Sequence, residues 1–155
     1  MRYFFYGTLI DPEVLHTVLR RPVAPADRRP ALLRGFRRVY RRGADYPVLV
    51  PDGSRTVEGI VFSGLGQRDA ALLGAFEGNE YRTHLLPVRL RSGQVVRARV
   101  FLPGPGCEAS GEDWTIEEWR SRFRRDFLMR IRRTHRPSAL ADADMAETDA
   151  VAAEP

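Results

Sequence analysis

The sequence predicts a single α+β domain whose sheet is strongly curved or closed into a small barrel. The chain of 155 residues has the length of one ordinary domain. Short β-like runs separated by Gly, Pro, Asp and Asn fill residues 30–101, and only a few segments show helical spacing of apolar residues. Many short strands with a few helices laid against them are typical of the α+β class.

The N-terminal segment predicts a strand, a tight turn and a helix. Tyr3 to Tyr6 form a short buried strand in this interpretation, which ends at a turn made by Gly7 and Thr8. The next stretch, DPEVLHTVLRR, has the chemistry of a helix start, with Asp11 as the candidate N-cap and Pro12 at the first helical position. Its apolar residues recur with the spacing of one helix face: Val14, Leu15, Val18 and Leu19.

The middle of the chain predicts several strands around one helix. Strands are expected in ALLRGFRRVYRR, in YPVLVPDG, where a Pro-Asp-Gly turn closes the strand, and in TVEGIVFSGL. A helix is expected in GQRDAALLGAFEG, which Gly78 is suited to end. The segments YRTHLLPVRLRSG and QVVRARVFLPG alternate apolar and charged residues around a Ser-Gly turn, which predicts a hairpin.

The C-terminal part predicts one long helix and an acidic tail. Thr115 and Glu118 have the spacing of a capping box, and four apolar residues follow at four-residue intervals: Trp119, Phe123, Phe127 and Ile131. From Pro137 onward the chain has no arginine, five acidic residues and little bulk to bury. We therefore expect a domain over residues 1–136, including the helix 115–133, and a disordered acidic tail over residues 137–155.

The charge and hydropathy patterns favour neither a specific nucleic-acid partner nor a membrane partner. The formal charge is +5, but all 25 basic residues are arginines and they are spread along the chain, which is typical of a GC-rich genome. We therefore expect no specific nucleic-acid partner. No apolar run approaches the roughly 20 residues of a membrane-spanning helix, and no secretory signal is recognisable. These observations predict a cytoplasmic protein without a membrane partner, and they leave its oligomeric state open.

No metal or cofactor site is predicted. Cys107 is the only cysteine, so an internal disulfide is excluded, and no Cys or His lies near it at metal-ligand spacing. His16, His84 and His135 are scattered and suggest no nucleophile and base pair. Generic catalytic motifs such as GxGxxG, the P-loop, HExxH and GxSxG are absent.

Two short segments carry candidate chemistry. In YGTL, Gly7 follows a buried strand and allows a ligand to approach main-chain N–H groups. In FEGNEY, Glu77 lies between an apolar helical face and a glycine turn, where desolvation would raise the pKa of its carboxyl and suit it to proton transfer near neutral pH. Taken alone, each pattern is more often structural, as a plain turn and as a solvated or capping glutamate.

Taken together, the two segments resemble the gamma-glutamylcyclotransferase-like proteins, a family that includes AIG2-like domains and gamma-glutamylamine cyclotransferases. The resemblance rests on FFYGTL, on ADYPVLVP followed by VEGIVF, on FEGNEYRTHLLPV and on VVRARVFLP, in family order over residues 1 to about 103. It implies a small mixed β-barrel with flanking helices, a cleft whose floor is the YGTL turn, and no metal or cofactor.

The resemblance also implies the reaction and its residues. Glu77, rather than Glu80, takes the position of the catalytic acid/base. The remaining candidates bind a small gamma-glutamyl substrate, the first four as the YGTL turn: Tyr6, Gly7, Thr8, Leu9, Tyr46 and Tyr81. The α-amine of the substrate attacks its own side-chain carbonyl, which releases 5-oxoproline and a free amine or amino acid. The identity of that leaving group stays open.

Two positions depart from the family pattern. Gly74 stands where many relatives carry an aspartate, and Phe101 where many carry a tyrosine in the last barrel strand. A carboxylate that orients the helix end and a hydroxyl that contacts substrate are both missing. The alternative hypothesis is therefore a non-catalytic protein that binds a small ligand, or interacts with a partner, through the same cleft.

Overall fold

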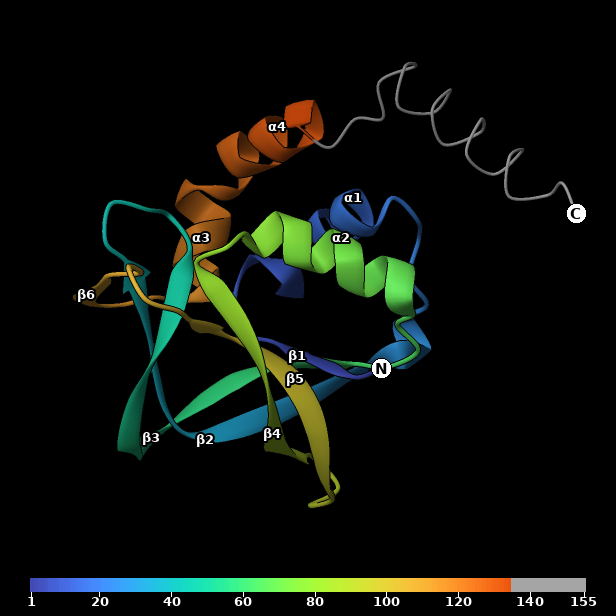
Figure 1. Ribbon diagram of the computed structural model, residues 1–155, viewed down its shortest axis with the longest axis vertical. Coiled ribbons are helices and arrows are strands. Elements are labelled where there is room, and N and C mark those ends of the chain that lie inside the picture. The colour runs from blue at the N-terminus through green and yellow to red at the C-terminus, as the bar shows by residue number, and fades with distance from the viewer. Residues whose placement is uncertain (135–155) are drawn as a thin grey trace, which may run out of the picture.

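The protein is an α+β barrel, as the sequence predicts (Figure 1). The computed structural model describes residues 1–134, so the tail expected over residues 137–155 lies outside the described residues. The strands are β1 (Tyr3–Phe5), β2 (Arg28–Arg41), β3 (Pro47–Phe62), β4 (Tyr81–Leu90), β5 (Val95–Pro103) and β6 (Ala109–Asp113). The helices are α1 (Pro12–Leu19), α2 (Gln67–Glu77), α3 (Ile116–Arg122) and α4 (Arg124–Thr134), with short 3-10 turns η1 (Thr8–Ile10) and η2 (Pro25–Asp27).

The barrel closes because its two longest strands pair with each other. The strands follow the order β3-β1-β5-β4-β2, and β2 pairs again with β3 to complete the circle. The β1–β5 pair is parallel and the other pairs are antiparallel, so the sheet is mixed. The short β6 is attached to β2. The helices gather on one side of the barrel (Figure 1), and the turn that follows β1 lies between the barrel and this helical layer.

Two hydrophobic cores flank the barrel wall, and β1 contributes to both. Phe4, together with Tyr6 directly after the strand, belongs to the core inside the barrel, whereas Tyr3 and Phe5 belong to the core under the helices. This is the two-residue alternation of a strand. A side chain at Gly59 would overlap the Phe5 carbonyl and the Phe4 ring, so only glycine lets β1 approach β3 this closely.

The prediction that a Pro-Asp-Gly turn ends the YPVLV strand is wrong. Instead, β3 continues from Pro47 to Phe62, and its pairing with β2 shifts in the middle. Arg34 lies opposite Thr56 and Phe36 lies opposite Pro51, so residues 52–55 form a bulge beside Gly35, whose φ is +89°. The turn chemistry is therefore used in a bulge, a feature that bends strands and helps a sheet to close.

The N-terminal helix begins as predicted. The side chain of Asp11 accepts hydrogen bonds from the backbone N–H groups of Glu13, at 3.0 Å, and Val14, at 3.3 Å. The same carboxylate, almost fully buried, also pairs with Arg124 of α4 at 2.7 Å. Asp11 thus caps α1 and ties the turn before it to the C-terminal part of the described chain.

The single helix expected over residues 115–133 is divided into α3 and α4. The predicted cap is present, because the Thr115 hydroxyl accepts a hydrogen bond from the Glu118 N–H at 3.2 Å. The helix breaks at Phe123, although neither proline nor glycine stands there. The bend turns α4 onto α1, where Arg124 reaches Asp11. Within residues 1–134, no helix is both long and apolar enough to span a membrane.

Candidate active site

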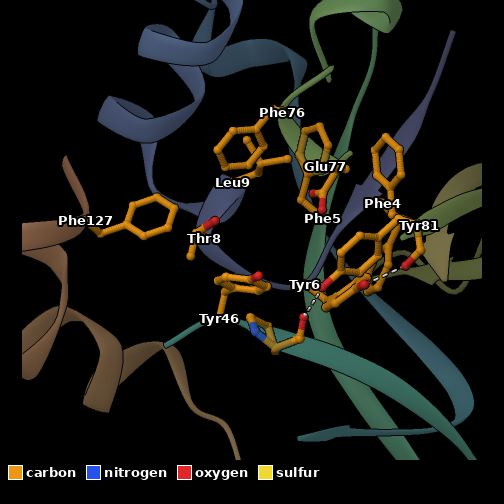
Figure 2. A pocket seen from close by; sticks show the side chains of 13 residues that line it. Phe4, Phe5, Tyr6, Thr8, Leu9, Tyr46, Phe76, Glu77, Tyr81 and Phe127 are labelled. Carbon is orange, nitrogen blue, oxygen red and sulfur yellow. Dashed lines mark hydrogen bonds between the residues drawn. The ribbon is translucent and has the colours of Figure 1, made fainter. Parts of the chain in front are cut away.

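A cavity of about 150 Å³ lies between the barrel and the helical layer. All seven residues predicted for the site line it (Figure 2): Tyr6, Gly7, Thr8, Leu9, Tyr46, Glu77 and Tyr81. They come from the turn after β1, the entry of β3, the end of α2 and the start of β4. Apolar residues that the sequence interpretation did not assign to the site as ligand contacts complete the wall: Phe4, Phe5, Pro47, Phe76, Phe101 and Phe127.

Glu77 is the last residue of α2, and its carboxyl faces this cavity. Burial raises the pKa of the carboxyl to about 8. The negative end of the helix dipole also disfavours a carboxylate at this position. Gly78 ends the helix with a φ of +77°, which favours glycine and turns the chain toward β4. The carboxyl can therefore exchange its proton close to neutral pH.

The turn after β1 contributes three residues to the lining of the same cavity, and their main-chain N–H groups are candidate donors. The carbonyls of Gly7 and Thr8 accept hydrogen bonds from Ile10, at 3.0 Å, and Asp11, at 3.1 Å, and so form η1. Within residues 1–134, the N–H groups of Gly7, Thr8 and Leu9 have no hydrogen-bond partner. Consecutive free amides of this kind bind anions and stabilise oxyanions.

The absence of a side chain at Gly7 is a requirement of this turn. A Cβ there would lie 2.9 Å from Cγ and 3.1 Å from Cδ of Pro47, both in a rigid ring. The turn can therefore pack against the first residue of β3 only with glycine at this position.

The hydroxyls of Tyr6 and Tyr81 both donate hydrogen bonds to main-chain carbonyls (Figure 2). The Tyr6 hydroxyl donates to the Phe101 carbonyl at 2.5 Å, and the Tyr81 hydroxyl donates to the Pro47 carbonyl at 3.2 Å. Burial, and then the nearby Glu77 carboxylate, raises the pKa of both phenols. Both therefore remain neutral. They brace the walls of the cavity and keep only oxygen lone pairs for a ligand.

Tyr46 differs from the other two tyrosines. Its hydroxyl accepts a hydrogen bond from Arg41 Nη1 at 2.9 Å, and the same guanidinium pairs with Glu80 at 2.5 Å. Because a guanidinium can only donate, the Tyr46 oxygen is the acceptor, and within residues 1–134 its own proton has no acceptor. Sequence reasoning missed Arg41, since nothing distinguishes it among the arginines of RRVYRR.

The two departures from the family pattern have different structural consequences. Gly74 is exposed on α2, does not line the cavity, and has open space where a side chain would project. Phe101 does line the cavity, and its ring stacks on Tyr3 with 5.7 Å between the centroids. The glycine therefore leaves the cavity wall intact, whereas the phenylalanine makes one part of that wall apolar.

The described residues offer no metal centre. Within residues 1–134, no group of three or more His, Cys, Asp and Glu side chains is arranged to hold a metal ion. Cys107 is a free thiol. The groups identified above for chemistry in the cavity are one carboxyl, three main-chain amides and one free phenol proton.

The closed mixed barrel with its flanking helices is the cyclotransferase-like fold. The chain matches the family model described as gamma-glutamyl cyclotransferase, AIG2-like, over residues 3–121, and it belongs to this family. It is 34% identical over 128 residues to AIG2-like protein C of Arabidopsis thaliana, in an alignment that covers 81% of this chain and 72% of the relative.

Solved structures agree with this assignment of the fold. The solution structure of an Arabidopsis thaliana protein, 26% identical, superposes with a TM-score of 0.62 over 83% of this chain and 85% of that protein. A structure described as a gamma-glutamyl cyclotransferase, 14% identical, has a TM-score of 0.58 over 90% of this chain and 89% of the other. At this identity the second similarity shows the fold alone.

Proposed function

We propose that the protein is a cyclotransferase that converts a gamma-glutamyl compound into 5-oxoproline and a free amine or amino acid. The observation that carries the proposal is that the Glu77 carboxyl, with its raised pKa, shares one cavity with the unpartnered amides of Gly7, Thr8 and Leu9. Membership of the family supports the reaction class. The geometry and chemistry of the cavity support the roles that we assign to individual residues.

Glu77 acts as the base and then as the acid. The positive α-ammonium of the substrate lowers the pKa of the nearby carboxyl and stabilises its ionised form. The carboxylate takes one proton from the ammonium, and the freed amine attacks the side-chain amide carbon to close a five-membered ring. Glu77 then returns a proton to the departing nitrogen as the amide C–N bond breaks. A second proton leaves the ring nitrogen, and the departing amine carries it away as an ammonium.

The turn amides stabilise the charge that develops during ring closure. The attacked carbonyl oxygen becomes an oxyanion in the tetrahedral intermediate. Donors fixed by the fold before the reaction need little reorganisation to bind this charge. One or two of the amides of Gly7, Thr8 and Leu9 serve this role, and the others hold the α-carboxylate. Because the attack is intramolecular, correct positioning of the glutamyl chain supplies much of the rate.

Tyr46 contributes the remaining donor. Its free proton is suited to the α-carboxylate or the amide oxygen of the substrate. The oxygens of Tyr6 and Tyr81 are suited to accept from the α-ammonium, since their own protons are already engaged. These contacts all recognise the glutamyl end of the substrate, so the leaving group must be identified by experiment.

The test is to incubate the purified protein with gamma-glutamyl amino acids and gamma-glutamyl amines and to measure 5-oxoproline. We expect release from at least one compound and a loss of at least roughly a hundredfold in Glu77→Gln, in line with the usual contribution of general acid–base catalysis. Glu108→Gln, a change to an exposed carboxylate that pairs with Arg42 and does not line the cavity, is the matched control. Turnover that persists undiminished in Glu77→Gln would contradict the mechanism. A folded protein that binds 5-oxoproline without turnover of any compound would favour the non-catalytic alternative.

A further inference from the structure

The side chain of Arg38, on β2, donates hydrogen bonds to three main-chain carbonyls next to the candidate site. Its Nη1 donates to the Tyr6 carbonyl at 2.8 Å and to the Glu58 carbonyl at 3.1 Å, and its Nε donates to the Trp114 carbonyl at 3.1 Å. The guanidinium lies over the Trp114 ring, with 5.2 Å from its central carbon to the ring centroid. Burial lowers the pKa of Arg38, yet an arginine remains charged under these conditions. One partly buried cation therefore holds the turn, β3 and the segment before α3 together.

The bond to the Tyr6 carbonyl fixes the orientation of the next amide. The Tyr6 carbonyl and the Gly7 N–H belong to one trans peptide, so they point in opposite directions within a single plane. Arg38 does not line the cavity, whereas Tyr6 and Gly7 do. With the carbonyl held on the Arg38 side, the Gly7 N–H is directed away from Arg38 and toward the cavity side of the turn.

The positive charge of Arg38 also acts on this peptide electronically. A cation at a carbonyl oxygen withdraws electron density from the peptide group. Its N–H then becomes a stronger donor, as in other polarised hydrogen-bond chains. This effect needs a direct bond to the carbonyl, and among the amides of Gly7, Thr8 and Leu9 only that of Gly7 shares a peptide with a carbonyl bound by Arg38.

We infer that Arg38 is a positioning residue for the reaction proposed above: it fixes and polarises the Tyr6–Gly7 peptide so that the Gly7 N–H stabilises the oxyanion. This inference rests on the proposed function. It assigns Arg38 no contact with the substrate and no proton transfer. It therefore predicts an effect on the rate of ring closure that is separable from the titration of Glu77.

The test compares Arg38→Gln and Arg38→Lys with the control Arg37→Gln. Arg37 is the preceding residue of β2 and bonds Asp113 at 2.7 Å and the Gly111 carbonyl at 2.9 Å, but it bonds neither Tyr6 nor the cavity wall. The substrate is the gamma-glutamyl compound that the wild type turns over best, and both kcat and KM are measured across pH from the release of 5-oxoproline.

The expected result is a fall in kcat of roughly tenfold to a hundredfold in Arg38→Gln, because one oxyanion donor is misdirected. KM, and the pH midpoint at which the rate rises as Glu77 ionises, should change little. A variant whose cavity is loosened would instead show a shift in both. Arg38→Lys should recover part of kcat, because an ammonium can still bond the Tyr6 carbonyl. The control should retain the wild-type kcat.

A second measurement does not depend on any variant folding. In the wild-type protein, binding of 5-oxoproline should shift the Gly7 amide proton strongly downfield in a two-dimensional NMR spectrum. A Gly7 amide that stays unshifted while those of Thr8 and Leu9 move overturns the inference. So does a folded Arg38→Gln with the kcat of the Arg37→Gln control, in an enzyme whose turnover depends on Glu77. If the wild type releases no 5-oxoproline from any compound, the proposed function fails, and the role of Arg38 fails with it.

Discussion

The Tyr46 hydroxyl accepts a hydrogen bond from Arg41 Nη1 at 2.9 Å, so its proton is the one phenolic proton among Tyr6, Tyr46 and Tyr81 that is free for a ligand. We expect Tyr46→Phe to lower kcat/KM for the release of 5-oxoproline by roughly tenfold to a hundredfold, the usual effect of losing a hydrogen bond to a charged group or a developing charge. The unfolding midpoint in urea should change little, since no buried carbonyl loses its donor. A large loss of stability with unchanged kinetics would assign Tyr46 to the core instead.

Tyr6→Phe should affect stability more than kcat/KM, the opposite of what we expect for Tyr46→Phe. Its hydroxyl donates to the buried Phe101 carbonyl at 2.5 Å, so the change leaves that acceptor without its partner. The free energy of unfolding should fall by about 1–3 kcal/mol, as for other unsatisfied buried groups. The measurement is urea denaturation of wild type and variant under the same conditions, together with kcat/KM. A loss of activity larger than that of Tyr46→Phe, at unchanged stability, would contradict the bracing role.

Gly7→Ala tests the close contact between the turn and β3. The added methyl group would lie 2.9 Å from Pro47 Cγ, so either the turn or the ring must shift. We expect kcat to fall at least roughly tenfold, because a small displacement of the amides disturbs the oxyanion site. Stability should fall by about 1–3 kcal/mol through overpacking. Gly74→Ala is the matched control, since a methyl group there meets open space. Normal kinetics in Gly7→Ala would exclude the turn as the oxyanion site.

The free energy of unfolding should depend on pH through the ionisation of Glu77. The pKa of its carboxyl rises from the ordinary value of 4.5 to about 8 in the folded state. Between these values the folded state binds more protons than the unfolded state, so stability falls as the pH rises. The contribution of Glu77 is complete below about pH 4.5 and is lost as the pH passes about 8. Urea denaturation of wild type and Glu77→Gln over this range measures it. The free energy of unfolding of the wild type relative to that of Glu77→Gln should fall as the pH rises from about 4.5 to about 8, and a difference that does not change with pH would contradict the raised pKa.

The sequence predicts the strand, turn and helix of the N-terminus because these elements depend on local signals, whereas the meeting of the YGTL and FEGNEY segments is expected from the family resemblance. Asp11 caps α1 as its residue type suggests. The Asp52–Gly53 pair is ambiguous in the sequence, since the same turn residues serve in a hairpin end or in a bulge, and only the pairing of β2 with β3 decides between them. The break at Phe123 likewise follows from tertiary contacts of α4 that no local pattern shows.

The supporting residues of the site were beyond sequence reasoning. Arg38 and Arg41 each act through one hydrogen bond, to the Tyr6 carbonyl and the Tyr46 hydroxyl, and both tyrosines lie outside β2. Both belong to one arginine-rich strand, so neither differs from its neighbours in type or spacing. Their roles depend on the tertiary partners that each side chain meets from β2, and no local sequence pattern shows these partners.

Glu77 is central to the proposed mechanism, as a base with a raised pKa that faces the turn amides. The decisive measurement is the pH dependence of kcat/KM for the release of 5-oxoproline by wild type and Glu77→Gln, with the titration of the substrate ammonium determined separately by NMR. We predict that the wild-type rate rises through an apparent pKa of about 8 and that the variant, at a rate lower by roughly a hundredfold or more, lacks this limb. A wild-type profile without that limb, or the same limb in Glu77→Gln, would contradict the assignment of Glu77 as the base.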